Sequence, residues 1–114
     1  MESKELSKTI TNLALEKKGK QIAVLDLQGL TSMTDYFIII TGDSDTHIKA
    51  IADHIIRQLK KKKTKIYHKE GLGSLRWVLL DYVDVIVHIF RGETREFYGL
   101  ERLWADAKIE FVIE

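Results

Sequence analysis

The stretch that decides the fold is WVLLDYVDVIVHIF, residues 77–90. Two apolar segments flank a short polar interruption at its centre, and their content of Val, Ile, Leu and aromatic residues favours strands. A turn centred on Tyr82 and Val83 therefore predicts a β-hairpin with strands at 75–80 and 85–90. The rest of the chain is interpreted outward from this hairpin.

The side chains of the hairpin divide into two faces, because successive residues of a strand point to opposite sides. With this turn, Trp77 lies opposite His88, and Asp81 lies opposite Asp84. One face is wholly aliphatic and must be core: Val78, Leu80, Val85, Val87 and Ile89. The other face mixes aromatic, acidic and imidazole side chains: Trp77, Leu79, Asp81, Asp84, Ile86, His88 and Phe90.

The mixed face has two interpretations. A patch that is partly apolar and partly acidic is typical of a protein interface. Alternatively, short helices expected at 93–98 and 100–107 cover the apolar part of this face. The sequence leaves both interpretations open.

The turn itself has an unusual residue. A two-residue hairpin turn requires positive φ at its central positions, which suits Asn or Gly and disfavours Val83. A four-residue loop in which Asp81 begins a type I turn avoids that cost. We therefore expect Asp81 and Asp84 to be turn residues rather than catalytic acids.

The flanking sequence completes an α/β domain. Apolar spacing predicts a helix over 3–18 and a second helix that begins after Asp43 or Ser44 and is closed by the lysines at 60–63. Strands are expected at 21–27, 36–41, 65–70 and, with the hairpin, in the last segment at 109–113. The segment 36–41 is apolar on both faces, which places it centrally in the sheet. We expect one domain over 1–114, with a mixed β-sheet of about five strands flanked by helices.

Composition restricts the classes of function. The chain has 114 residues, 45% of them hydrophobic, and no cysteine, so it has neither disulfides nor a thiolate metal site. No apolar stretch is long enough for a membrane span and no targeting segment is evident, so a cytosolic protein is expected. The net charge is +1, but residues 66–114 hold 6 basic and 9 acidic residues. An acidic second half suits a basic partner.

The sequence contains no strong motif for metal binding, phosphate binding or nucleic-acid binding. The histidines are scattered and the hairpin acids lack the spacing of metal ligands, so no metal site is expected. GLGS at 71–74 precedes a strand, unlike a phosphate loop, and TGDSDT at 41–46 opens a helix but has two acids and no lysine. The lysines of KKKTK at 61–65 are compatible with nucleic-acid contact, although a basic helix end is commonly solvated.

Four blocks along the chain resemble a known family. They are DYFIIITG at 35–42, S-x-x-H-x-x-A-I-A-D at 44–53, EGLGSLRWVLLDYVDVIVHIF at 70–90 and REFYGLERLWADA at 95–107. In order and spacing they resemble the ribosomal silencing factor family, also called the RsfS or Iojap family. That family usually has Gly where this chain has Val83, which puts the geometry of the turn in question.

The resemblance implies a non-enzymatic role. Such proteins bind the large ribosomal subunit through ribosomal protein L-fourteen (uL-fourteen), sterically block joining of the two subunits, and repress translation under nutrient limitation. The resemblance also implies a nucleotidyltransferase-like topology without catalytic residues, a homodimer in the free state and no cofactor. The alternative functions are a nucleotide-binding enzyme of that topology and RNA binding through Lys60–Lys65, although no specific nucleic acid is expected.

We expect the partner to contact the mixed face and the aromatic turns that follow it. The candidate partner-binding residues are Trp77, Asp81, His88, Tyr98, Glu101 and Trp104. Aromatic residues are enriched at interface centres, and the acids can pair with Arg or Lys of a partner. The helical spacing of Phe97, Leu100, Leu103 and Trp104 predicts that two or three of these four pack on the sheet.

Overall fold

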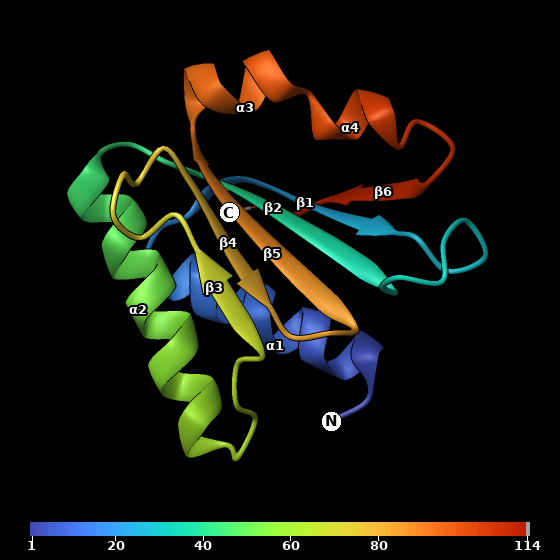
Figure 1. The fold of residues 1–114 in the computed structure, drawn as a ribbon, viewed down its shortest axis with the longest axis horizontal. Helices are drawn as coiled ribbons and strands as arrows, with labels where there is room; N and C mark the ends of the chain where they lie inside the picture. The colour runs from blue at the N-terminus through green and yellow to red at the C-terminus, as the bar shows by residue number, and fades with distance from the viewer. Residues whose placement is uncertain (114) are drawn as a thin grey trace.

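The computed structural model describes residues 1–113 (Figure 1). The helices are α1 (Ser3–Glu16), α2 (Asp45–Lys61), α3 (Gly92–Tyr98) and α4 (Leu100–Leu103). The strands are β1 (Lys20–Asp26), β2 (Tyr36–Gly42), β3 (His68–Glu70), β4 (Trp77–Asp81), β5 (Val85–Arg91) and β6 (Lys108–Phe111). The expected α/β class is confirmed.

The strands form a single mixed sheet in the order β3-β4-β5-β2-β1-β6. Only β2 and β5 are parallel, and every other neighbouring pair is antiparallel. The strand predicted to be central, β2, is indeed an inner strand. Within residues 1–113 the sheet has six strands rather than about five, and the last segment, expected to be a strand, pairs with β1 at the edge.

Helices cover both faces of the sheet (Figure 1). Helices α1 and α2 pack on one face, where the aliphatic residues of the hairpin are fully buried. The apolar stripe of α2 is buried as its spacing predicts: Ile48, Ile51, Ala52, Ile55 and Leu59. Ser44 caps α2 by accepting a 3.1 Å hydrogen bond from the N–H of His47. Helices α3 and α4 lie on the other face.

The register of the β4–β5 hairpin differs from the predicted one by two residues. Trp77 lies opposite Phe90 rather than His88, and Asp81 lies opposite Ile86 rather than Asp84. Because the shift is an even number, each side chain remains on its predicted face. The faces were therefore predicted correctly, although the pairs across them were not.

Val83 adopts the left-handed conformation, with φ 72°. The expected type I turn, which would have avoided this conformation, is therefore wrong. Asp81 Oδ1 accepts a 2.7 Å hydrogen bond from the N–H of Val83, which confirms that Asp81 is a turn residue. The carbonyl of Asp84 accepts hydrogen bonds from the N–H groups of Asp35 and Tyr36. These contacts join Asp84 to the start of β2. The register shift arises in the turn, because the N–H of Tyr82 donates to the carbonyl of Val85 at 2.9 Å and leaves Val83 and Asp84 as the loop residues.

Candidate partner-binding surface

Helices α3 and α4 cover the centre of the mixed face. Gly99, with φ 54°, breaks the chain between the two helices and lets α4 fold down on the sheet. Leu100 is buried and Trp104 is half-buried in a cluster with Phe90, whose side chain is inaccessible to solvent. Two of the four helically spaced residues therefore pack on the sheet, as expected.

His88 lies beneath this cover. It is only 4% exposed, and its ring contacts Phe37 edge-on at a centroid distance of 4.5 Å. Its Nδ1 accepts a 3.0 Å hydrogen bond from the indole N–H of Trp77. The prediction that His88 itself faces a partner does not suit this burial, and its contacts instead make it a support for Trp77.

The environment of His88 favours the neutral imidazole. Burial lowers the pKa of His88 to about 4. Since Nδ1 accepts from Trp77, the proton of the neutral ring resides on Nε2, which is buried and has no hydrogen-bond partner in the structure. A group held neutral in this way is a structural element of the aromatic cluster.

Glu101 also has an internal role. Its Oε2 accepts a 3.2 Å hydrogen bond from Nε of Arg95, a guanidinium that is only 7% exposed. Arg95 additionally donates to the carbonyl of Gln21 and, at 2.9 Å, to the hydroxyl of Thr41. The pair therefore ties α3 and α4 to the ends of β1 and β2. Glu101 was expected to pair with a partner, but this carboxylate is already engaged by Arg95.

The surface offered to solvent by α3 and α4 combines apolar side chains with the acids Glu93 and Glu96 and with Arg102. Phe97 is 79% exposed, Leu103 72% and Tyr98 47%, and Tyr98 packs against the half-buried ring of Trp77 at 4.6 Å between centroids. We call these three exposed residues, with the accessible parts of Trp77 and Trp104, the contact surface.

Three acids accompany the contact surface: Glu93 and Glu96 lie on α3, and Asp106 lies in the turn that follows α4. Glu93, Glu96 and Asp106 are exposed, and within residues 1–113 they form no ion pair. The sequence-based list of candidates omitted Phe97 and Leu103. Helical spacing could not decide which of the spaced residues point outward.

Asp84 and the start of α2, which a nucleotide-using enzyme would have to bring together, are far apart. Asp84 precedes β5 and Asp43 follows β2, and because these strands are parallel and paired along their length, roughly 20 Å separates the two ends. His47 also occupies the start of α2, accepting the N–H of Asp43 at Nδ1 and contacting the carbonyl of Lys17 through Nε2. Across residues 1–113, no three His, Asp or Glu side chains are grouped to hold a metal ion.

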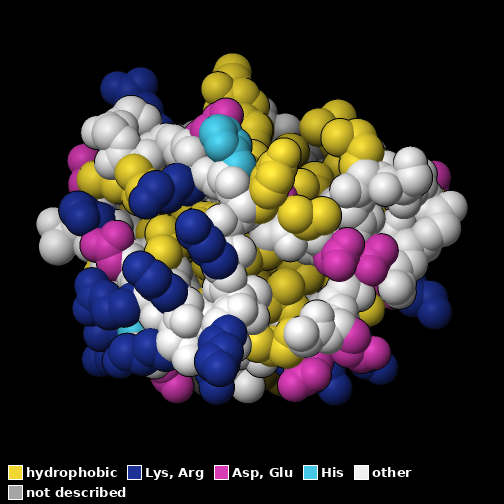
Figure 2. All heavy atoms as spheres, turned by 60° about the horizontal axis from the view of Figure 1, so that its bottom comes forward, with side chains coloured by type: hydrophobic (Ala, Val, Ile, Leu, Met, Phe, Trp, Pro, Cys, Tyr) yellow, Lys and Arg dark blue, Asp and Glu magenta, His cyan; other side chains and the backbone are white. Residues whose placement is uncertain are grey.

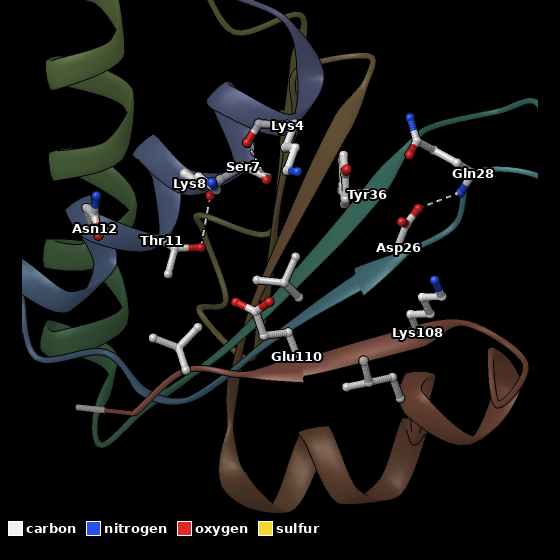
Figure 3. A pocket seen from close by; sticks show the side chains of 13 residues that line it. Lys4, Ser7, Lys8, Thr11, Asn12, Asp26, Gln28, Tyr36, Lys108 and Glu110 are labelled. Carbon is white, nitrogen blue, oxygen red and sulfur yellow. Dashed lines mark hydrogen bonds between the residues drawn. The ribbon is translucent and has the colours of Figure 1, made fainter.

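A second feature is a groove between α1 and the β1–β6 edge, with a volume of about 780 Å³ (Figure 3). It exists because α1 and α2 leave this end of the sheet uncovered. Lys4 and Lys8 border it on α1, and Asp26 and Glu110 face it from the strands. The polar groups satisfy one another locally, as where Asp26 accepts from the N–H of Gln28 at 3.0 Å. The groove contains no convergent catalytic set.

The fold defines a class: a small mixed-sheet α/β domain whose helices α3 and α4 leave large apolar side chains exposed. None of the helices in residues 1–113 has the length and apolar character needed to cross a membrane. The family model described as "Ribosomal silencing factor during starvation" matches residues 1–113. The chain belongs to the ribosomal silencing factor family, which confirms the resemblance seen in the sequence.

Relatives and a solved structure agree with this assignment. The chain is 37% identical to the ribosomal silencing factor RsfS of Bacillus subtilis, over 96% of this chain and 92% of that protein. A crystal structure of a protein from Chromobacterium violaceum is similar at TM-score 0.90 and 38% identity, covering 100% of this chain and 95% of the other. A more distant relative, 31% identical over 83% of this chain and 43% of that protein, is mitochondrial assembly of ribosomal large subunit protein 1 of Mus musculus.

Proposed function

We propose that this protein is a ribosomal silencing factor that acts in the cytoplasm. It binds the large ribosomal subunit through ribosomal protein L-fourteen, and its bulk prevents the small subunit from joining. Translation is thereby repressed under nutrient limitation. The mechanism is steric and requires no cofactor, no metal ion and no chemical step.

The contact surface is the single observation on this chain that carries the proposal. Exposed Phe, Tyr and Trp side chains are enriched at interface centres and cost free energy when they remain in water. The exposed acids of α3 and of the turn after α4, Glu93, Glu96 and Asp106, complement a basic ribosomal protein. The family supports the ribosome as the target, and the name of the mouse relative points to the large subunit.

Of the residues expected to bind a partner, we retain Trp77, Tyr98 and Trp104 and add Phe97 and Leu103. We assign Asp81, His88 and Glu101 to internal roles, because His88 is buried and the carboxylates of Asp81 and Glu101 accept hydrogen bonds from Val83 and Arg95. The internal residues hold the turn, the indole and the two short helices in place. The retained residues make the contact.

The free protein is proposed to be a homodimer. Leaving the contact surface in water is unfavourable, and a second copy can cover the same apolar side chains. Sedimentation equilibrium of the purified chain tests this, with Phe97→Ser as the variant that weakens association. A monomer at tens of micromolar protein would refute the dimer without affecting the docking proposal.

Subunit joining gives the direct test of function. Purified protein is added to dissociated subunits, magnesium is raised, and joining is followed by light scattering. We expect inhibition at protein concentrations near stoichiometry with the large subunit, together with co-sedimentation on that subunit alone. Unchanged joining without co-sedimentation would overturn the proposal.

A further inference from the structure

The charge of the molecule is concentrated at one end. The segment 57–69 holds seven of the 18 Lys and Arg residues and none of the 17 Asp and Glu residues. The remaining residues, eleven basic and seventeen acidic, are therefore net negative by six. We call this segment the cationic end, and its basic residues are Arg57, Lys60, Lys61, Lys62, Lys63, Lys65 and Lys69.

All seven of these side chains are exposed, and none takes part in an ion pair within residues 1–113. The helix dipole accounts for part of the cluster, since Lys60 and Lys61 lie in the last turn of α2. Lys63, Lys65 and Lys69 lie beyond the end of the helix, where the dipole gives them no stabilisation. The seven cations repel one another, and no acidic side chain described in residues 1–113 pairs with them to offset this repulsion.

An aromatic ring belongs to the same segment. Tyr67 is 75% exposed, although its backbone is fixed by a 2.9 Å hydrogen bond from its N–H to the carbonyl of Asp81. Exposed aromatic rings beside lysines are the usual means of binding single-stranded nucleic acid, because phosphates pair with the cations and bases stack on the ring.

The position of the cationic end leaves it free when the contact surface is occupied. The end of α2 and strand β3 lie at the lower left of Figure 1, whereas α3 and α4 run along the top. Figure 2, which brings the lower side forward, shows Lys and Arg side chains gathered on the left, on the side where α2 lies. A partner seated on α3 and α4 therefore does not cover these cations.

We propose that the cationic end is a second docking surface, which binds the phosphate backbone of RNA without reading its sequence. The conclusion that this RNA is ribosomal rests on the function proposed above; the binding of RNA phosphates does not. On the ribosome, the contact surface would engage protein and the cationic end would engage RNA.

Salt dependence of RNA binding provides the test. Anisotropy of a fluorescein-labelled single-stranded RNA of about 20 nucleotides is titrated from 50 to 200 mM KCl, to give the slope of log affinity against log salt. The triple variant Lys61→Gln/Lys62→Gln/Lys63→Gln should lower the magnitude of this slope by about 2, since each lost phosphate contact removes about 0.7. A second RNA of unrelated sequence should give the same slope.

The matched control removes three positive charges at a different place on the molecule. Lys4→Gln/Lys8→Gln/Lys108→Gln changes three exposed lysines beside the α1 groove, two of which stand on α1 in Figure 3, and should leave the slope unchanged. Tyr67→Ser should weaken single-stranded binding about tenfold while preserving the slope, because stacking carries no charge. Equal slopes for the two triple variants would overturn the proposal, as would tighter binding to vesicles of anionic lipid than to RNA at the same salt.

Co-sedimentation with the large subunit separates this proposal from the function proposed above. If the protein sediments with the subunit but does not bind RNA, the cationic end is not an RNA surface and the silencing function stands. If it binds RNA but not the subunit, the silencing function fails and the RNA surface stands.

Discussion

The indole N–H of Trp77 donates a 3.0 Å hydrogen bond to Nδ1 of His88, joining strands β4 and β5 beneath helices α3 and α4. The bond requires a neutral imidazole, because a protonated ring has no acceptor nitrogen. The contact surface therefore rests on a histidine that must remain uncharged. Acidification should loosen the support of Trp77, the ring that is proposed to face the partner.

The pH dependence of stability follows from this histidine. Its folded pKa of about 4 lies below the unfolded value of 6.5, so between these values the unfolded chain binds more protons. The contribution is complete above pH 6.5 and is lost as the pH falls toward 4, amounting to about 3 kcal/mol. Urea unfolding at pH 7.5 and 5.0 measures the loss. His88→Phe should show a smaller loss over the same interval, and an equal loss would contradict the assignment.

The Arg95–Glu101 pair yields a prediction about stability rather than binding. Glu101→Lys removes the carboxylate from a buried guanidinium and adds a second cation beside it, which should lower the free energy of unfolding by about 3 kcal/mol. Glu96→Lys makes the same charge change on an exposed side chain and should cost less than about 0.5 kcal/mol. Urea unfolding of both variants at pH 7.5 tests this prediction. Similar midpoints would show that the Arg95–Glu101 pair contributes little to stability.

Much of the fold was accessible from the sequence because local patterns and tertiary structure agree. The stripe of α2, a cap at Asp43 or Ser44, the inner position of β2 and the two faces of the hairpin follow from periodicity and capping. The hairpin register was not accessible, since it depends on a turn in which Tyr82 pairs with Val85 and Val83 takes φ 72°. A β-branched residue disfavours that conformation, so the local sequence did not indicate this turn.

The surroundings of the candidate site residues could be predicted only in part, because the chain breaks between the two short helices. The left-handed Gly99 brings Glu101 back toward Arg95, so a carboxylate that spacing placed on the surface acquires an internal partner. The same turn directs Leu100 inward and leaves Leu103 exposed. Helical periodicity does not extend across such a break, and so the exposure of Phe97 and Leu103 could not be predicted from spacing.

Val83 is the residue whose conformation the sequence most clearly disfavoured. A β-branched residue at φ 72° is strained, and glycine removes the clash of its Cβ with the backbone. Val83→Gly should therefore raise the free energy of unfolding by about 1 kcal/mol, measured by urea unfolding. Val83→Ala retains Cβ and should gain less. A loss of stability in the glycine variant would show that the side chain contributes packing that outweighs the strain.

The contact surface can be tested without disturbing the fold. Phe97→Ser and Leu103→Ser alter side chains that are mostly in solvent, so each should change the free energy of unfolding by less than about 0.5 kcal/mol. Each should weaken large-subunit binding about tenfold or more, as expected for central residues of an interface. Co-sedimentation at a fixed subunit concentration measures the change.

Trp77→Ala provides a comparison, because this side chain supports the fold and is also proposed to contact the partner. Its indole packs on Phe90 and Tyr98 and supplies the bond to His88, so its removal should destabilise the chain by about 2 kcal/mol as well as weaken binding. Val83→Ala, at the far end of β4, is exposed in the same way as Phe97 and Leu103 and should bind the subunit normally. If both serine variants bind as tightly as the parent chain while Val83→Ala weakens binding, the docking face is the turn end of the hairpin and the contact surface is wrongly assigned.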